Sequence, residues 1–525
     1  MVASLELPTP VSEYGSRIVQ HTVALAPKSA DIRSSCGPGG RLVGKSDLSR
    51  DGIVAETGDE MGRAQLSRRS VLKYGSIGAA ALGLAACSGT AQSGAKGSSG
   101  TGGDTLTIWT WAGASILQSA FNAVKATSKD FAGFKTNIQT VAANDYATAE
   151  KFSLALSGGT TLPDILQLNY TEMPQFAAAG VLEELSTVYA PHSADLYAGA
   201  LQVAKYNNSY YAFPESLNPK LFYYRSDLFA EAKIDPTSIT TTEDFIAAGT
   251  AFHRKFPSQY IMNLNTEPQP YVFGEMISAY APISFASPSG SYQVTSNPGF
   301  EQVFSFLDQI ASAKIAYPVD DFTTDWPSAI KNEKICGFLG ADWLDEFVPG
   351  YATQSQYGKW KAIPWPTLSP MANQQYGSDA GGSVFVVPKG APNSQAAVEF
   401  LKQWRLSPDG SLAAFNATGI LPINSTTAST VISSLSTAKK PASTSQADWL
   451  ELPQHYFGPD YIATKLQAMN RVKVFGYDPS AVKEWSSIVS NWLTKLLSGR
   501  ASVSAALAGL QQDMQTQVGN PYSNG

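Results

Sequence analysis

The feature that most constrains this chain is an alternation of strand-like and helix-like segments that begins near Thr105. Residues 105–111, 136–141 and 164–168 are short and apolar or β-branched, and helix-length segments at 114–129 and 145–156 separate them. The last of the three strands, DILQL, is almost wholly apolar, which is typical of a strand buried on both faces. Strands separated by helices predict a parallel sheet, and therefore an α/β fold.

The alternation continues less regularly towards the C-terminus. The run TTTED at 240–244 offers Thr-x-x-acid capping boxes, and Asn297-Pro298 offers a cap followed by a first-turn proline, so a helix is expected after each. Further strands are predicted in LFYYRSDLF, ICGFLG and GSVFVVPKG, and further helices in SQAAVEFLKQW, 480–497 and 501–517. The body of the chain therefore reads as α/β throughout.

An export address lies well inside the chain. Arg68 and Arg69 form a basic pair, and an apolar run of signal-peptide length leads from them to Cys87. SRRSVLK resembles a twin-arginine motif with Val71 in place of the usual Phe, and LAAC resembles a lipobox. We interpret residues 61–86 as a twin-arginine lipoprotein signal peptide and Cys87 as the lipidated residue. The alternative is a buried Ala/Gly-rich helix with a stray cysteine.

The segments around this address carry little sign of folded structure. Residues 1–60 show no sustained period, and we expect them to be a misassigned or disordered extension, with Met61 as the true start. GGRLVGKS at 39–46 fits a P-loop, but no strand precedes it and no helix follows, so nucleotide binding is not expected. Residues 87–103 form a Gly/Ser linker.

Composition excludes some functions and favours others. The net charge is −6 and no basic run occurs, so nucleic acid is a poor partner. Charged residues make up 15%, below the usual quarter or so, while aromatic residues reach 11%. Flat rings on a weakly charged surface suit an uncharged, hydroxylated ligand, although an aromatic core would give the same numbers.

The three cysteines are expected to have different roles. Cys36 lies in the extension and Cys87 would carry lipid, so only Cys336 remains and no internal disulfide can form. Cys336 sits in the apolar stretch KICGFLG, which predicts a small buried thiol. We expect the exported protein to be held at the membrane by lipid alone.

Several stretches together resemble the extracellular solute-binding proteins of ABC importers, in the branch that carries sugars and maltodextrins. They run in family order from Thr105 to Trp404: TLTIWTW, LPDILQLNY, NNSYYAFPESLNPKLFYYRSDLF, NEKICGFLGADWLDEF and GGSVFVVPKGAPNSQAAVEFLKQW. Asn208 and Ser209 replace the glycine that the family has before its paired tyrosines. The resemblance implies a two-lobed periplasmic-binding-protein type II fold with a hinge and a ligand cleft.

The same resemblance implies the organisation and partners of the protein. Lobe 1 would comprise residues 104–214 and about 384–440, and lobe 2 residues 215–383 and about 441–525. The loaded binder would dock on a membrane permease pair with its ATPase, outside the cytoplasm. We expect a monomer without cofactor, metal or catalytic activity.

A sugar site needs flat rings for C–H faces and polar side chains for hydroxyl groups. Ligands gather where parallel strands end, at their carboxyl edge. The candidate ligand-binding residues follow predicted strands or the crossover between lobes; they are Trp111, Asp145, Tyr170, Glu215, Trp343, Asp379 and Gly382.

Each candidate also has an ordinary structural alternative. One of Trp109 and Trp111 should belong to the core, and Asp145 could simply cap a helix. Glu215 could be a solvated hinge acid, and Gly382 could only turn the chain. Trp343 could be a core residue, in which case its replacement would cost stability rather than affinity.

Other function classes fit the sequence less well. A glycosidase needs paired carboxylates; Asp320-Asp321 and the group Asp342, Asp345 and Glu346 exist, but adjacent acids usually mark a solvated face. No G-x-S-x-G or H-E-x-x-H motif occurs, and the four histidines are scattered. A peptide, polyamine or metal complex in the same fold stays an alternative. Dispersed acids favour a neutral sugar.

Overall fold

The first sheet contains the strands that the alternating pattern predicted. The computed structural model describes residues 105–111, 113–141, 147–265, 276–277, 284–365, 377–437 and 453–523. The order of the strands in the first sheet is β2-β1-β3-β13-β6. The strands are β1 (Thr105–Thr110), β2 (Lys135–Thr140), β3 (Ile165–Asn169), β13 (Ser383–Val386) and β6 (Phe213–Pro214). β1 runs parallel to β2 and β3, which confirms the predicted parallel pairing.

The other half of this sheet is antiparallel. β13 pairs antiparallel with β3, where Ser383 lies opposite Asn169, and also antiparallel with β6. β13 enters the sheet after a long excursion through the second sheet rather than through a helical crossover, so its direction is not set by a βαβ unit. The sheet is therefore mixed, and Ser383 begins its strand where β3 ends.

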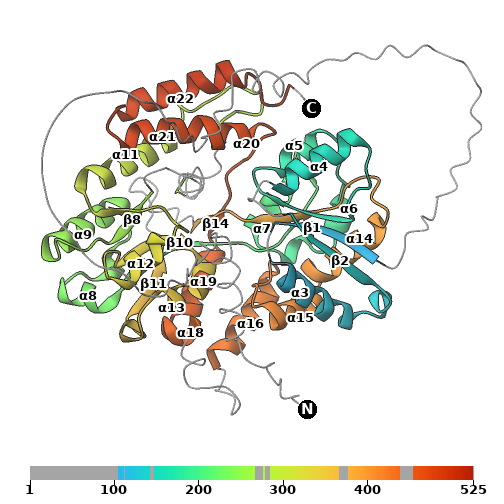
Figure 1. Cartoon of the computed structure of the whole chain (residues 1–525), viewed down its shortest axis with the longest axis horizontal. Coiled ribbons are helices and arrows are strands. Elements are labelled where there is room, and N and C mark those ends of the chain that lie inside the picture. Colours follow the sequence, from blue (N-terminus) through green and yellow to red (C-terminus); the bar gives the residue numbers. More distant parts are fainter. Residues whose placement is uncertain are drawn as a thin grey trace, which may run out of the picture. The chain divides into compact units, whose positions relative to one another are not determined.

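Helices with apolar faces cover the first sheet (Figure 1). They are α3 (Ala114–Thr127), α4 (Ala147–Gly158), α5 (Met173–Ala178), α6 (Ser186–Tyr189), α7 (Ala198–Val203), α14 (Ser394–Arg405) and α15 (Pro408–Thr418). α3 buries Leu117, Phe121 and Val124, spaced three and four residues apart as one helix face requires. Phe121 stacks on Phe400 of α14 with ring centroids 4.3 Å apart, which joins α3 to a helix far along the chain.

The second sheet is antiparallel and lies in the order β10-β7-β11. Its strands are β10 (Gly337–Ala341), β7 (Lys220–Arg225) and β11 (Trp360–Pro364), and every residue of β7 is buried. At Gly337 an added Cβ would lie 2.5 Å from the Ile261 carbonyl oxygen, so only glycine allows this approach. Cys336, just before β10, is a buried free thiol as predicted, and burial raises its pKa to about 12.

Capping signals read from the sequence operate at two helices of this region. Thr241 and Asp244 form the predicted capping box of α9 (Thr242–Lys255), and the Asn297 side chain accepts a hydrogen bond from the Gly299 amide at α11 (Pro298–Ala313). The neighbouring elements are α8 (Ser226–Glu231), β8 (Met262–Leu264), β9 (Ala316–Pro318), α12 (Asp325–Lys331) and α13 (Val348–Tyr351).

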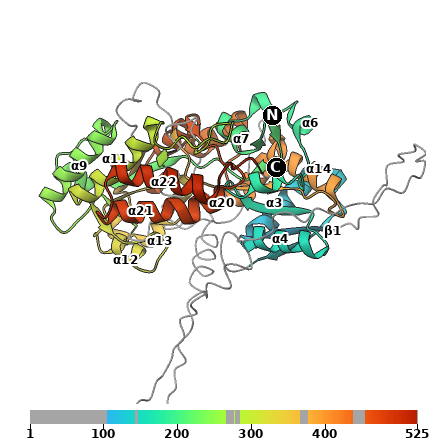
Figure 2. The ribbon, with the colours of Figure 1, turned by 90° about the horizontal axis from the view of Figure 1, so that it is seen from above.

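The C-terminal part is helical, with one irregularity. Residues 480–497, predicted as one helix, form α20 (Ala481–Lys483), a π-helical turn (Glu484–Val489) and α21 (Ser490–Leu497). α22 (Val503–Gln517) then packs beside α21 and α11 (Figure 2). The other α-helices and strands of the described residues are β4 (Lys205–Tyr206), β5 (Ser209–Tyr210), β12 (Gly377–Ser378), α16 (Ser425–Thr437), α18 (Pro453–Tyr456), α19 (Tyr461–Met469) and β14 (Val472–Lys473).

The two sheets have separate hydrophobic cores, and the chain passes between them more than once. Leu217 belongs to the first core, and Leu221 of β7 belongs to a core of the second sheet. Near the C-terminus Val474 belongs to the first core and Phe475 to a core of the second sheet. The lobe boundaries named above stay a prediction.

Candidate ligand-binding site

Trp111 and Trp109 lie at the end of β1, and the structure separates their roles. Trp109 is 6% exposed and belongs to the first core, with the Lys151 Nζ atom 3.7 Å from its ring centroid. Trp111 follows the last residue of β1 and is half-buried. Trp109 is therefore the core member of the pair, and Trp111 stays partly exposed.

Glu215 takes part in a polar network at the carboxyl edge of the first sheet. The Gln167 amide nitrogen donates to Glu215 Oε2 at 2.8 Å and to Ser383 Oγ at 2.9 Å. Ser383 Oγ also donates to Glu215 Oε2, and Thr110 Oγ1 donates to Gln167 Oε1. Three neighbouring strands thus hold one oxygen of a half-buried carboxylate in a defined position.

The sequence reading missed the centre of this network. Gln167 is 4% exposed and lies between the apolar residues Leu166 and Leu168 of DILQL. A polar side chain in a strand buried on both faces must find hydrogen bonds there, so it signals a buried network. The polar residue is visible in the sequence. Its hydrogen-bond partners are not, because they lie at positions 110, 215 and 383.

Arg405 adds a buried positive charge next to Glu215. Its side chain is 1% exposed, and its Nε donates to the Pro214 carbonyl at 2.8 Å, one residue before Glu215. Burial lowers the pKa of Arg405 to about 10, against the opposing effect of the Glu215 carboxylate. Arg405 ends the amphipathic helix α14, where a sequence pattern suggests only a solvated basic residue at a helix C-terminus.

Tyr170 and Gly382 contact each other at the end of β3. Tyr170 is 3% exposed and its hydroxyl donates to the Ser216 carbonyl at 2.9 Å. A Cβ added to Gly382 would lie 2.6 Å from that hydroxyl oxygen and 2.9 Å from the Asn218 amide nitrogen. Burial raises the pKa of Tyr170 well above its usual range, and Asp379 and Glu215 raise it further. The glycine is needed here for close approach.

Asp379 lies where residues 218–219 pair with residues 379–381. The Asn218 side-chain Nδ2 donates to the Gly381 backbone carbonyl at 2.8 Å. The Ala380 backbone N–H donates to the Asn218 backbone carbonyl, also at 2.8 Å. Pro219 and Asp379 form an isolated antiparallel bridge. Asp379 is 2% exposed. The structure therefore brings Tyr170, Glu215, Asp379 and Gly382 together at the crossover.

Trp343 lies on the surface, directly after a strand of the second sheet. It follows β10 in the 3₁₀-helix Asp342–Glu346, and its side chain is 37% exposed. Its ring stacks on Phe322 with centroids 5.8 Å apart and planes inclined by 22°. A core role for Trp343 is thereby excluded, because a core tryptophan such as Trp326 is only 1% exposed.

The expectation that the acids near Trp343 form a solvated face was wrong. Asp342 and Asp345 are 5% and 3% exposed, and Lys465 Nζ lies 3.2 Å from Asp342 Oδ2 and 2.9 Å from Asp345 Oδ2. Tyr461 also donates to Asp345 Oδ2 at 2.6 Å. The cation comes from α19, far along the chain, so adjacency in sequence could not reveal it.

The pKa shifts follow from this burial. Burial raises the pKa of Asp342 to about 6, and Lys465 opposes the rise. Burial alone would lower the pKa of Lys465, but the two carboxylates outweigh it and raise that pKa. Asp321, another acid expected to be solvated, is half-buried and accepts a hydrogen bond from the Asn263 amide at 2.6 Å. Burial raises the pKa of Asp321 to about 6.

Some predicted residues lie outside the described residues. Asp145 falls in the undescribed segment 142–146, and Arg68, Arg69 and Cys87 precede residue 105. Within the described ranges, no three His, Cys, Asp or Glu side chains are grouped so that they could hold a metal ion. Nor does that part of the chain contain a helix long and apolar enough to cross a membrane.

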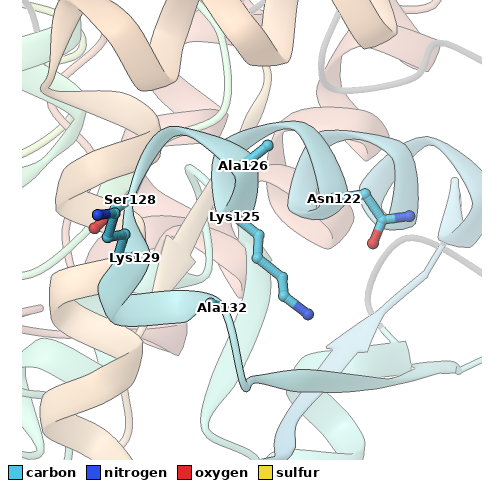
Figure 3. A pocket seen from close by; sticks show the side chains of 6 residues that line it. All are labelled: Asn122, Lys125, Ala126, Ser128, Lys129 and Ala132. Carbon is cyan, nitrogen blue, oxygen red and sulfur yellow. The ribbon is translucent and has the colours of Figure 1, made fainter.

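A surface hollow of about 460 Å³ lies away from these residues, at the end of α3 (Figure 3). It is lined by Asn122, Lys125, Ala126, Ser128, Lys129 and Ala132. Lys125 already donates to the Phe134 carbonyl at 2.7 Å. None of the predicted site residues lines this hollow, so it is not the candidate site.

Comparison with known proteins gives the family. The model of the bacterial extracellular solute-binding proteins matches residues 122–442, more than half of the chain. A diacetylchitobiose-binding protein of Streptomyces coelicolor, DasA, is 24% identical over 376 residues, which cover 68% of this chain and 82% of that protein. An uncharacterised ABC transporter extracellular-binding protein of Pyrococcus horikoshii is 24% identical over 50% of this chain and 60% of its own length.

Solved structures agree on the fold. A binding protein of Bifidobacterium animalis subsp. lactis in complex with β-1,6-galactobiose superposes with a TM-score of 0.62 at 22% identity, over 80% of this chain and 99% of that one. The sugar-binding protein MalE of Xanthomonas citri gives a TM-score of 0.62 at 19% identity, over 80% and 97%. The predicted two-lobed α/β binding-protein fold is thereby confirmed. The chain belongs to the bacterial extracellular solute-binding proteins.

Proposed function

We propose that this protein is the substrate-binding component of an ABC importer for a mono- or oligosaccharide. The ligand would lie between the two sheets, in contact with Trp111 and Glu215 on one side and Trp343 on the other. Closure of the two lobes would follow from these simultaneous contacts, since a ligand favours the closed form only through interactions that the open form lacks.

The observation that carries this proposal is the exposed ring of Trp343. A tryptophan that is 37% exposed and stacked on a second exposed ring, Phe322, presents an apolar face to solvent at the end of a strand. Such rings bind the C–H face of a sugar, and ordered carboxylates such as Glu215 accept hydrogen bonds from sugar hydroxyl groups.

Several relatives support a carbohydrate ligand. The ligands of these relatives include diacetylchitobiose, β-1,6-galactobiose, lacto-N-biose, cycloalternan and maltose. One structural neighbour, UgpB of Mycobacterium tuberculosis, is described in complex with glycerophosphocholine, so the fold also accepts a polar non-sugar ligand. A ligand screen must therefore contain a polar non-sugar compound as well as saccharides.

The protein would be exported through its twin-arginine motif, anchored by lipid on Cys87 at the outer face of the cell membrane, and would deliver its ligand as a monomer to a permease pair with an ATPase. We expect it to bind without catalysing a reaction, because binding is the role of its family.

A ligand screen tests the proposal directly. Thermal melts of residues 87–525 are measured with diacetylchitobiose, β-1,6-galactobiose, lacto-N-biose, maltose and glycerophosphocholine. A ligand present at a hundred times its dissociation constant stabilises the fold by about 2.7 kcal/mol. Stabilisation by a saccharide supports the proposal. Stabilisation by glycerophosphocholine alone overturns the carbohydrate assignment.

Replacement of Trp343 by alanine then tests the site. With the saccharide found in the screen, Trp343→Ala should cost about 2–4 kcal/mol of binding free energy, as for a buried aromatic anchor. It should cost only about 1 kcal/mol of unfolding free energy, because the ring already faces solvent. Leu154→Ala, which removes a side chain that is 74% exposed on α4, is the control and should leave affinity unchanged. Unchanged affinity in Trp343→Ala would remove this residue from the site.

Cys87→Ala tests the anchor. Because lipid attaches to the cysteine sulfur, the variant should move from the detergent phase to the aqueous phase with its fold intact. Replacing both Arg68 and Arg69 by lysine should block export through the twin-arginine route. Continued partition of Cys87→Ala into detergent would refute the lipid anchor.

A further inference from the structure

Phe322 has an unfavourable backbone conformation. Its φ is +61°, a left-handed value that costs energy for any residue with a bulky side chain. Its side chain is also 50% exposed, so burial of the ring does not explain the conformation. A strained residue with an exposed ring persists only where its surroundings hold it in place.

Hydrogen bonds on both sides of Phe322 hold this backbone. Asp321 Oδ1 accepts from the Asn263 amide nitrogen at 2.6 Å, and the Asp321 amide donates to Asn265 Oδ1 at 3.3 Å. Thr323 Oγ1 donates to the Asp320 carbonyl at 2.8 Å. Asn263 and Asn265 are 7% and 4% exposed, so the turn is tied to buried groups beside β8.

The ring of Phe322 lies between a buried and an exposed tryptophan. It meets Trp326, which is 1% exposed, edge to face with centroids 5.4 Å apart, and it stacks on Trp343 at 5.8 Å. Trp343 has one other described ring contact, an edge-to-face arrangement with Phe347 at 5.8 Å. Phe322 therefore links the exposed ring of Trp343 to the core.

We propose that Phe322 is a positioning residue, whose left-handed backbone places its ring against Trp343 so that the tryptophan is held rigid as a stacking surface for a sugar ring. This inference rests on the proposed function for its ligand. A ring that is already immobile loses less conformational freedom when a ligand stacks on it, and this raises affinity. Phe322 acts through Trp343 and need not touch the ligand.

The first test follows the motion of Trp343 without any sugar. Fluorescence anisotropy decay and quenching by acrylamide are measured for the wild type and for Phe322→Ala, Phe322→Gly and Phe322→Tyr. Because the chain has ten tryptophans, the Trp343 signal is the difference between each protein and the same protein carrying Trp343→Phe. Leu154→Ala is the matched control that removes an exposed apolar side chain elsewhere.

Phe322→Ala and Phe322→Gly should both increase the fast motion and the acrylamide quenching of Trp343. Phe322→Tyr and Leu154→Ala should match the wild type. Glycine adopts a positive φ freely, so loosening in Phe322→Gly shows that the ring, and not the strained backbone, holds Trp343. Unchanged motion of Trp343 in both Phe322→Ala and Phe322→Gly would overturn the inference.

The second test uses maltose and diacetylchitobiose in calorimetric titrations of the same proteins. Phe322→Ala should weaken binding by about three- to tenfold, the size expected for one aromatic pair, and Phe322→Tyr should restore it. Equal affinity in wild type and Phe322→Ala, with a loosened Trp343, would overturn the role in binding. If neither maltose nor diacetylchitobiose binds the wild type, neither sugar is the ligand, and the anisotropy experiment alone decides whether Phe322 holds Trp343.

Discussion

Replacing Lys465 by methionine should destabilise the protein by about 3–5 kcal/mol, the cost of removing one partner from a buried ion pair. The Lys465 side chain is 11% exposed, and those of Asp342 and Asp345 are 7% and 4% exposed. Methionine matches the length of the lysine stem but carries no charge. The variant therefore leaves two carboxylates in the interior without their cation.

The magnitude rests on burial, so a surface ion pair provides the control. Lys402 pairs with Glu399 on α14, where the two side chains are 34% and 49% exposed. Lys402→Met should cost less than about 1 kcal/mol, because solvent screens the pair. Urea unfolding followed by tryptophan fluorescence gives the free energy of unfolding of each variant.

Two further measurements separate loss of charge pairing from loss of packing. Adding Asp342→Asn and Asp345→Asn to Lys465→Met should recover most of the loss, since no buried charge remains unpaired. The loss should also shrink as the pH falls, because burial raises the pKa of Asp342 and the variant has no cation to oppose that rise, so this carboxylate becomes neutral. Equal losses in Lys465→Met and Lys402→Met, independent of pH, would refute this reasoning.

Two other outcomes are expected. Burial raises the pKa of Glu484, and the nearby Asp478 raises it further. The neutral form of Glu484 therefore stabilises the fold, and this contribution to the free energy of unfolding is complete below the ordinary pKa of a glutamate. It is lost as the pH rises through the raised pKa. Glu484→Gln should flatten this fall in thermal melts across pH, and a slope equal to that of the wild type would contradict it. Gly382→Ala should cost about 1–3 kcal/mol, because its Cβ meets the Tyr170 hydroxyl oxygen at 2.6 Å. Tyr170→Phe in the same protein should recover part of that loss in urea unfolding, and no recovery would argue against the clash.

Local patterns were enough for much of the fold. The first strands and helices, the capping box of α9 and the cap of α11 all follow from residues within a few positions of each other. Periodicity and capping depend on near neighbours, so a single sequence reports them. The one helix predicted at 480–497 contains a π-helical turn, and there Glu484 is buried and accepts a hydrogen bond from Tyr292, far along the chain.

Local sequence patterns predicted only part of the candidate site. The sequence indicated that Glu215 lies at the crossover between lobes and that Trp343 follows a strand. It did not indicate that Gln167 and Ser383 hold the Glu215 carboxylate. Nor did it indicate that Phe322 stacks on Trp343. These contacts join residues between 21 and 168 positions apart.

What the sequence by itself determined is the order of strands and helices, the family resemblance and the residue types offered to a ligand. Only the tertiary structure decided which of these residues are accessible. Asp342 and Asp345 are buried because Lys465 arrives from α19 to neutralise them, while Trp343, between them in the sequence, stays exposed. Burying a charge depends on finding its partner in space, and separation along the chain does not reveal that partner.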